Sequence, residues 1–526
     1  MKVDTFLQTL RLSAIATATT LLAACAVGPD YARPTAIESS GFSPQALPNQ
    51  TASTPAQGGA SQRFVKGQDI RADWWQLFQS YELNALIAKS FSANPNLESA
   101  QAALRAAQEN VYAQRGFFYP SVQTSYSMAR TKLAGNAGGS SPGIQGDGSV
   151  ISTGQGTPAS DGGTAPFNAP VLYNFHTAQL TVGYTPDIFG SNQRQLESLE
   201  AQAASQQFQL EAAYITLASN IVAAAIQDAM LRQQIAITQE IISDSTTALD
   251  LLRRQVKAGY ASRLDLANQE NAFAQVRLLL PPLTKQFEQN RNLLRALSGA
   301  AQDTEIPAFA LQSLHLPEEL PASLPSQLVE QRPDVRAAEE QLHAASAQIG
   351  VARAARLPQF SISASAGGAA SNFGQMFWDS GTFFNLALGI SQTIFDGGTL
   401  KHRERAAEAA MRQAASQYRS TVITAFQNVA DSLQAIHIDA QAMQTASDLA
   451  TAAKTTLNLT QHQYVHGYLD RLALINAQQG DRQAQLSLVQ AQGSRLGDTA
   501  VLFQALGGGW WHRNADAATT VLRAPP

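Results

Sequence analysis

Residues that could do chemistry are few in this sequence of 526 residues, and they lie far apart. His462 and His466 are four residues apart, so both rings would lie on one face of a helix and could bind one metal ion. No third ligand and no catalytic glutamate accompany them, and we interpret them as solvated histidines near a helix end. The sequence contains no nucleophile elbow, phosphate-binding loop or dinucleotide fingerprint. We therefore predict a protein that is not an enzyme, with no catalytic residues, no metal and no organic cofactor.

The single cysteine, Cys25, cannot form an internal disulfide. It follows an uncharged run over 12–24, which has the form of a secretory signal and is too short to span a bilayer. Residues 22–24 resemble the motif at which bacterial lipoprotein precursors are cleaved before an acylated cysteine. We expect residues 1–24 to be removed and Cys25 to carry a covalent lipid; the alternative is a buried free thiol after a chance apolar run. Ala26 follows where inner-membrane lipoproteins commonly have aspartate, which favours the outer membrane.

Charge is sparse along the whole chain. Charged residues make up 14% of the sequence, against about 25% in an ordinary soluble domain. The net charge is −4 and the pI is near 6.1, and no basic stripe is present. This composition suits closely packed helices and excludes a nucleic-acid partner.

An internal duplication organises the sequence. The segment from Asn94 to Pro120 corresponds to that from Arg332 to Pro358, with the prolines equally spaced in both. A second block, Gly259-Tyr260 with Arg263-Leu264 and Asn268, recurs as Gly467-Tyr468 with Arg471-Leu472 and Asn476.

Two proline-free stretches, 191–257 and 398–466, carry apolar residues at helical spacing. As helices, each would span about 100 Å at 1.5 Å per residue. Shorter helices are expected over 264–297 and 334–357. Helices of this length are longer than the diameter of any compact domain, and their length approaches the depth of a periplasm.

Each copy of the repeat also contains two segments in which polar and apolar residues alternate: 121–128 with 177–184, and 359–366 with 385–391. Such alternation is typical of transmembrane β-strands, although a half-buried sheet would show it too. Four strands cannot close a barrel, and unpaired strand edges are not tolerated in lipid. A barrel must therefore be shared among two, three or four copies, and the attached helices would continue it as a ring.

The predicted organisation is 1–24 signal, 25–80 N-terminal arm and equatorial segment, 81–300 first repeat, 301–332 inter-repeat equatorial segment, 333–506 second repeat and 507–526 tail. A Gly/Ser/Thr-rich insertion over 131–170 has no hydrophobic period and is expected to be a solvated loop. With the segment 372–380, it lies between paired strands, so both should face the outside of the cell.

The segment from Cys25 to Pro34 resembles the mature N-terminus of the NodT/OprM-type outer-membrane efflux lipoproteins. Trp74-Trp75, Asn94 to Leu97 and the two Gly-Tyr…Arg-Leu blocks resemble the same family, over nearly all of the mature chain. The resemblance implies an α+β membrane protein that forms a TolC-like homotrimer. It would have a 12-stranded transmembrane β-barrel, with four strands per chain, continued by a long periplasmic α-helical barrel with an equatorial mixed region.

The implied function is the outer-membrane channel of a tripartite efflux pump, a passive conduit for small molecules such as drugs. The implied partners are outer-membrane lipid, a periplasmic adaptor (membrane fusion) protein and an inner-membrane RND-type pump. A TolC-like channel for protein secretion is the alternative within this class. A periplasmic adaptor lipoprotein that forms no channel would need only one helical hairpin and no duplicated strands.

The resemblance also implies that the turns at Gly259-Tyr260 and Gly467-Tyr468 form periplasmic tips that contact the adaptor. Opposite charges beside the two tips could tie neighbouring hairpins together in a closed state. Related channels often place carboxylates after the second tip, where this chain has Ala473 and Asn476, so Asp265 becomes the expected source of negative charge. The candidate gate residues are Arg263, Asp265, Asn268, Asp470, Arg471 and Asn476.

Overall fold

The computed structural model describes residues 26–35, 41–42, 48–133, 142–144, 150–152, 171–322 and 325–513. The predicted signal, Cys25, most of the 131–170 insertion and the end of the tail lie outside these residues. The chain divides into two compact units, and each combines segments of both repeats. One unit comprises Met1–Ala32, Ala107–Ala203 and Gln341–Ala414, and the other comprises Arg33–Ala106, Ala204–Glu340 and Ala415–Pro526.

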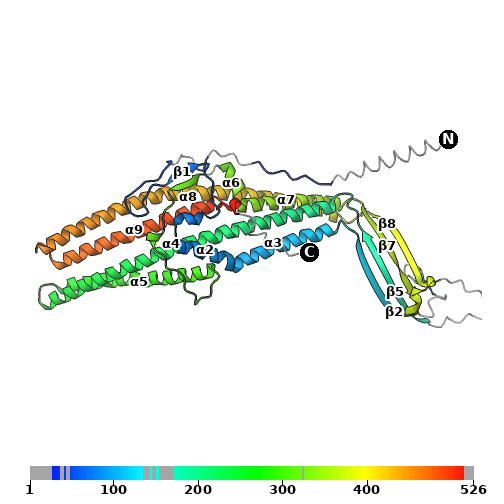
Figure 1. Ribbon diagram of the computed structural model, residues 1–526, viewed down its shortest axis with the longest axis horizontal. Coiled ribbons are helices and arrows are strands. Elements are labelled where there is room, and N and C mark those ends of the chain that lie inside the picture. The colour runs from blue at the N-terminus through cyan, green and yellow to red at the C-terminus, as the bar shows by residue number, and fades with distance from the viewer. Residues whose placement is uncertain are drawn as a thin grey trace, which may run out of the picture. The chain divides into compact units, whose positions relative to one another are not determined.

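The first unit contains an antiparallel sheet of four strands, which lie side by side in Figure 1. Its strands, in spatial order, are β2 (Ser121–Leu133), β5 (Val171–Tyr184), β7 (Gln359–Ala370) and β8 (Thr382–Ser391). The four strands predicted from alternation are thus confirmed, and each extends beyond the alternating segment.

The insertion is less irregular than its composition predicts. Strand β2 continues to Leu133, and β3 (Pro142–Ile144) pairs with β4 (Val150–Ser152). The expectation of a loop throughout 131–170 is therefore wrong at these residues.

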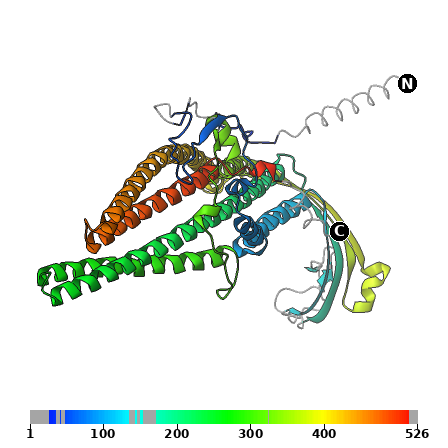
Figure 2. The same ribbon diagram turned by 60° about the vertical axis from the view of Figure 1, so that its left-hand side comes forward.

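Long helices follow the repeat. α4 (Ser191–Lys257) and α8 (Thr399–Val465) each contain 67 residues, and no proline interrupts either. α5 (Arg263–Leu297) and α9 (Arg471–Ala505) each contain 35 residues. In Figures 1 and 2, α4 with α5 and α8 with α9 form two antiparallel hairpins.

The helices that lead to the strands are α3 (Pro95–Gly116) and α7 (Pro333–Ala354), and both begin at the duplicated proline. Proline fits the first turn of a helix, where its missing N–H has no acceptor to lose. The predicted helix 334–357 ends earlier than expected, because Pro358 disfavours helical backbone at the residue before it.

The second unit holds the main hydrophobic core. Apolar positions on one face of α4, including Ile221, Val222 and Ala225, are fully buried. Trp74 is fully buried as well and stacks on Phe503 of α9, with ring centroids 5.2 Å apart. Trp74 thus packs inside the protein.

One window of α4 is long and apolar enough to cross a membrane, but 67% of it is buried within the protein. Such burial is typical of a helix in the core of a protein.

An equatorial region ties the N-terminal arm to the inter-repeat segment. β1 (Arg63–Lys66) pairs in parallel with β6 (Glu319–Ala322). Arg495 of α9 is buried beneath the arm, where it donates hydrogen bonds to Thr51 Oγ1 and to the Ala60 carbonyl. Burial lowers the pKa of this guanidinium below its ordinary value. The remaining elements are η1 (Trp74–Phe78), α2 (Tyr81–Ala93), η2 (Leu311–Ser313), α6 (Pro325–Gln331), η3 (Phe373–Phe377), η4 (Asp379–Gly381) and η5 (Trp510–His512).

Candidate functional site

The four-stranded sheet has one apolar and one polar face. Its register aligns Val122, Val182, Ala364 and Leu386 in one row across all four strands. The next row is polar and contains Gln123, Thr181, Ser365 and Asn385. Alternate residues of a strand point to opposite faces, so these rows place apolar and polar side chains on opposite faces of the sheet.

The apolar face is exposed to the surroundings rather than covered by the chain's own helices. Phe384, Leu386 and Leu388 of β8 are 85%, 74% and 71% exposed. An apolar sheet face of this extent is unfavourable in water and suits contact with lipid. The polar face would then line an aqueous lumen.

Exposed aromatic residues flank the sheet at both ends. Phe117, Phe118 and Tyr119 directly precede β2, and Phe395 follows β8. At the opposite end, between β7 and β8, Phe373, Phe377 and Trp378 are exposed. Paired aromatic girdles mark the two water interfaces of a transmembrane β-barrel.

Strands β2 and β8 are the two edges of the sheet, because each pairs with only one neighbour among the described strands. A row of unpaired backbone groups therefore runs along each edge. In hydrocarbon, each unsatisfied group costs several kcal/mol. The sheet is complete in a membrane only when these edges pair with other copies of the chain.

The two helical hairpins end in turns of identical design. Gly259 and Gly467 adopt φ of 81° and 78°, the left-handed conformation that ends a helix. After each glycine, the tyrosine N–H donates to the carbonyl five residues earlier, Tyr260 to Gln255 at 2.8 Å and Tyr468 to Gln463 at 2.9 Å. Tyr260 and Tyr468 are 86% and 80% exposed. The turns thus present two free aromatic rings for contact with another molecule.

The six candidate gate residues are all exposed beside these turns. Asp265 belongs to a capping box at the start of α5: its carboxylate accepts hydrogen bonds from the Ser262 N–H at 3.0 Å and the Ser262 hydroxyl at 2.7 Å. These bonds hold the pKa of Asp265 below its ordinary value. Asp470 caps α9 by accepting from the Ala473 N–H at 2.8 Å. Both carboxylates thus have a local structural role, and a role in gating stays a prediction.

Within the described part of the chain, the charges at the two tips form no ion pair with one another. The hairpins are joined further from the tips, where Arg482 Nε of α9 lies 2.8 Å from Glu240 Oε2 of α4. Gln479 also donates to the Ser245 hydroxyl at 2.8 Å. The repeat could not reveal Arg482, because Ala274 occupies the corresponding position of the first copy. The rings of His462 and His466 lie 4.3 Å apart between centroids with their planes tilted by 31°, near the end of α8.

The described N-terminal segment docks inside the first unit. The Val27 N–H donates to the Phe189 carbonyl at 3.1 Å, and Asp30 accepts from Arg194 at 2.7 Å. The hydrogen bond with Asp30 is the main reason why the pKa of buried Arg194 is raised. Tyr31 stacks on His343 with centroids 4.3 Å apart. The residues that follow Cys25 are therefore held at the turn between β5 and α4.

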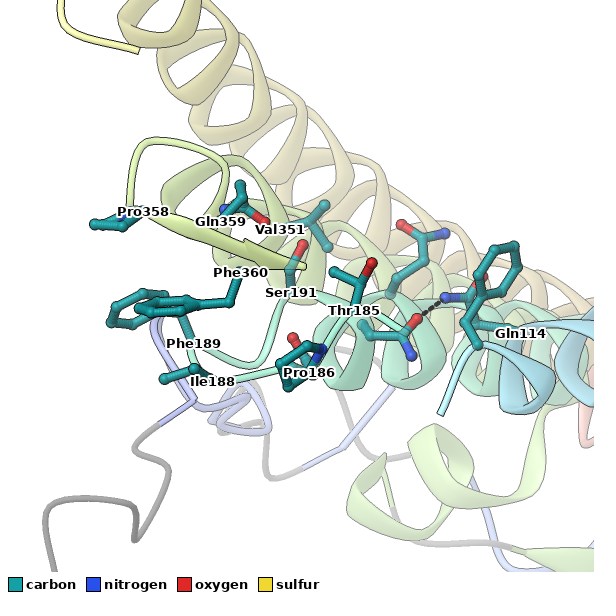
Figure 3. Close-up of a pocket in the computed structure, with 14 residues that line it drawn as sticks. Gln114, Thr185, Pro186, Ile188, Phe189, Ser191, Val351, Pro358, Gln359 and Phe360 are labelled. Atoms are coloured by element: carbon teal, nitrogen blue, oxygen red, sulfur yellow. Dashed lines mark hydrogen bonds between the residues drawn. The ribbon is translucent and has the colours of Figure 1, made fainter. Parts of the chain in front are cut away.

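A cavity of about 320 Å³ opens beside this turn (Figure 3). Ile188, Phe189 and Phe360 lie on its apolar side, while Gln114 lies at the other end and donates a hydrogen bond to Asn192. Sequence reasoning missed the cavity, because its walls come from three separate segments of the chain.

Comparison with known proteins gives a consistent result. The family model described as outer membrane efflux protein matches residues 86–300 and 324–508. The chain is 28% identical over 515 residues to a probable efflux pump outer membrane protein, TtgC, of Pseudomonas putida, and the match covers 97% of this chain and 98% of the relative. It is 27% identical over 467 residues to the pyoverdine export outer membrane protein OpmQ of the same species, covering 88% and 93%.

A solved structure shares the fold. The CmeC outer membrane channel of Campylobacter jejuni matches with a TM-score of 0.78 at 18% identity, over 95% of this chain and 98% of that one. This likeness supports the combination of strands and long helices described above.

Proposed function

Because the chain belongs to the outer membrane efflux protein family, we propose that it is the outer-membrane channel of a tripartite efflux pump and works as a homotrimer. Three copies supply 12 strands, and β2 of one copy pairs with β8 of the next to close the barrel. The polar rows of the sheet line the lumen and the apolar rows face lipid. The two hairpins of each copy continue the conduit into the periplasm.

The observation that carries this proposal is the four-stranded sheet with opposite faces of different polarity and two unpaired edges. A soluble protein would cover the apolar face, and an adaptor with one helical hairpin would have no such sheet. The family and the fold are those of channels. We therefore propose a passive conduit that provides a path for the cargo and catalyses no reaction.

Small molecules are the proposed cargo, because the relatives are named for pyoverdine export and as a probable efflux pump component. No feature of the described residues favours protein secretion. The exposed tip turns at Gly259-Tyr260 and Gly467-Tyr468 are the proposed contacts for a periplasmic adaptor, which would link the channel to an RND-type pump of the inner membrane.

Cys25 is the proposed lipid anchor. Its neighbour Ala26 is held at the end of the sheet where the aromatic residues mark a membrane interface. Incorporation of labelled fatty acid into the mature protein, lost in Cys25→Ala, is the expected result.

Deletion of the gene tests the export role. The deletion should raise the intracellular accumulation of small apolar toxic compounds, and the wild-type gene should restore efflux. Protein secretion should be unaffected. Unchanged accumulation of all such compounds, together with loss of a secreted protein, would instead establish the secretion alternative.

A further inference from the structure

The start of the described chain is pressed against the turn between β5 and α4. A Cβ atom added to Gly190, whose φ is 74°, would lie 2.7 Å from the Cα of Ala26. The close approach requires glycine at this position. Gly28 makes a second close approach, because its Cβ position lies 2.5 Å from the Cα of Gly350. The backbone is thus fixed at two points within three residues.

Covalent geometry then limits where residue 25 can be. Consecutive Cα atoms are about 3.8 Å apart across a trans peptide bond. Ala26 is fixed on Gly190, so the peptide bond that joins it to Cys25 leaves from beside this turn. A lipid on its sulfur would begin beside Ile188 and Phe189, which come just before Gly190 in the chain and line the cavity.

The cavity has the size for part of an acyl chain and has one apolar side. Its volume of about 320 Å³ is roughly twice that of the apolar cavity of about 150 Å³ that holds benzene in another protein. Phe189 and Phe360 lie next to each other on its apolar side, with ring centroids 6.4 Å apart and ring planes tilted by 42°, and both are only half-buried. The amides of Gln114 and Asn192, which are hydrogen-bonded to each other, close the other end of the cavity.

The position of the cavity relative to the membrane also agrees with an acyl chain. Its lining includes Phe117, which belongs to the aromatic girdle before β2, and Phe360, which lies at the start of β7. The cavity therefore lies at the interface between hydrocarbon and water, where an acyl chain meets its polar linkage.

We propose that this cavity seats a segment of an acyl chain of the lipid on Cys25, so that the anchor is bound to its own protein as well as to the bilayer. The inference rests on the proposed lipidation of Cys25. A seated chain fixes the N-terminal segment and fills space between the β5–α4 turn and the start of β7. The alternative source of the same chemistry is a membrane phospholipid.

The test uses full-length protein in cells that incorporate a fatty acid carrying a photoreactive diazirine. After irradiation, the outer-membrane protein is purified and cross-linked peptides are identified by mass spectrometry. The lipidated N-terminal peptide should be joined to the peptide that contains Ile188-Phe189 or the one that contains Phe360.

Two variants should abolish these cross-links by different routes. Val351→Trp places a large side chain in the cavity, and Gly190→Ala pushes Ala26 away from the turn. The matched control is Ile394→Trp, which adds the same ring at a fully exposed position at the same end of the sheet and should leave the cross-links unchanged. Each variant is first shown to reach the outer membrane with its strand content intact.

Cross-links that persist undiminished in Val351→Trp, or that form only to other regions, overturn the seat but leave the lipid anchor in place. Absence of the labelled fatty acid from the protein overturns the anchor and the seat together. Labelling of the cavity in Cys25→Ser by a photoreactive phospholipid at wild-type yield assigns the cavity to membrane lipid and overturns the proposal.

Discussion

Asp265 shows how one side chain near a tip can serve two purposes. Its carboxylate completes the capping box of α5 and also places a negative charge beside the turn. Asp265→Asn separates the two roles, because the amide oxygen can still accept from the Ser262 N–H while the charge is lost.

We expect Asp265→Asn to weaken the preference for cations, measured as the reversal potential in planar bilayers under a salt gradient. Ser262→Ala is the matched control: it removes the hydroxyl of the cap, which costs the helix about 0.5–2 kcal/mol, and keeps the charge. Wild-type selectivity in Asp265→Asn together with altered selectivity in Ser262→Ala would show that the cap matters and the charge does not.

Asp439 of α8 forms a carboxyl pair with Asp498 of α9. Burial, the hydrogen bond to Asp498 and its charge raise the pKa of Asp439 to about 7. Between pH 3.8 and about 7, the folded protein therefore retains a proton that an unfolded aspartate, with a pKa near 3.8, has released. The stability gained from this proton is complete below pH 3.8 and is lost as pH rises through about 7.

Asp439→Asn should remove this dependence, because the amide is neutral at every pH. We expect its melting temperature to exceed that of the wild type by a margin that grows from pH 5 to pH 8. Asp431→Asn, at an exposed position of the same helix, should follow the wild-type profile. If the melting temperatures of Asp439→Asn and the wild type changed in parallel with pH, Asp439 would not hold the proton that we infer.

At the residue scale, the sequence predicts those features that occur in both copies of the repeat. Gly259 and Gly467 recur in matching blocks, and both end a helix in the same way. The Arg482–Glu240 pair and the Asp439–Asp498 pair have no counterpart in the other copy. They depend on which helix faces come together, and helical periodicity alone does not set that.

At the element scale, the absence of proline and the period of apolar residues predict α4 and α8 to within a residue at each end. Strict alternation predicts that the four strands exist, but each strand extends beyond its alternating segment at one end. β1 and β6 escape such reasoning, because each has four residues, β6 contains Pro321, and their pairing joins distant segments.

Arg482 provides the charged link between the two hairpins, so its loss should favour their separation. An exposed pair contributes about 0–1 kcal/mol, and three copies that break together would shift an opening equilibrium by up to roughly 150-fold. We expect Arg482→Ala to raise the open probability of single channels in planar bilayers.

The charge swap Arg482→Glu with Glu240→Arg should restore the closed state, whereas either swap alone should not. Lys454→Ala, which removes a positive charge from an exposed position of α8, serves as the control. A closed state as stable in Arg482→Ala as in the wild type would place the link elsewhere.

At the scale of the whole molecule, the unpaired edges of β2 and β8 decide how the chain exists in a membrane. Sequence reasoning alone leaves two, three or four copies open, since strand number per chain fixes only multiples of four. We propose three copies, and the polarity of the sheet faces would then give an aqueous lumen surrounded by lipid.

The most direct test of this account is the mass of the native complex, released from lipid nanodiscs into the mass spectrometer after extraction from the outer membrane. We predict three chains per complex, and loss of strand content by circular dichroism when heat separates them, because the four strands of one chain cannot satisfy their edges in lipid. A monomer that keeps its full strand content in the nanodisc would contradict the shared barrel.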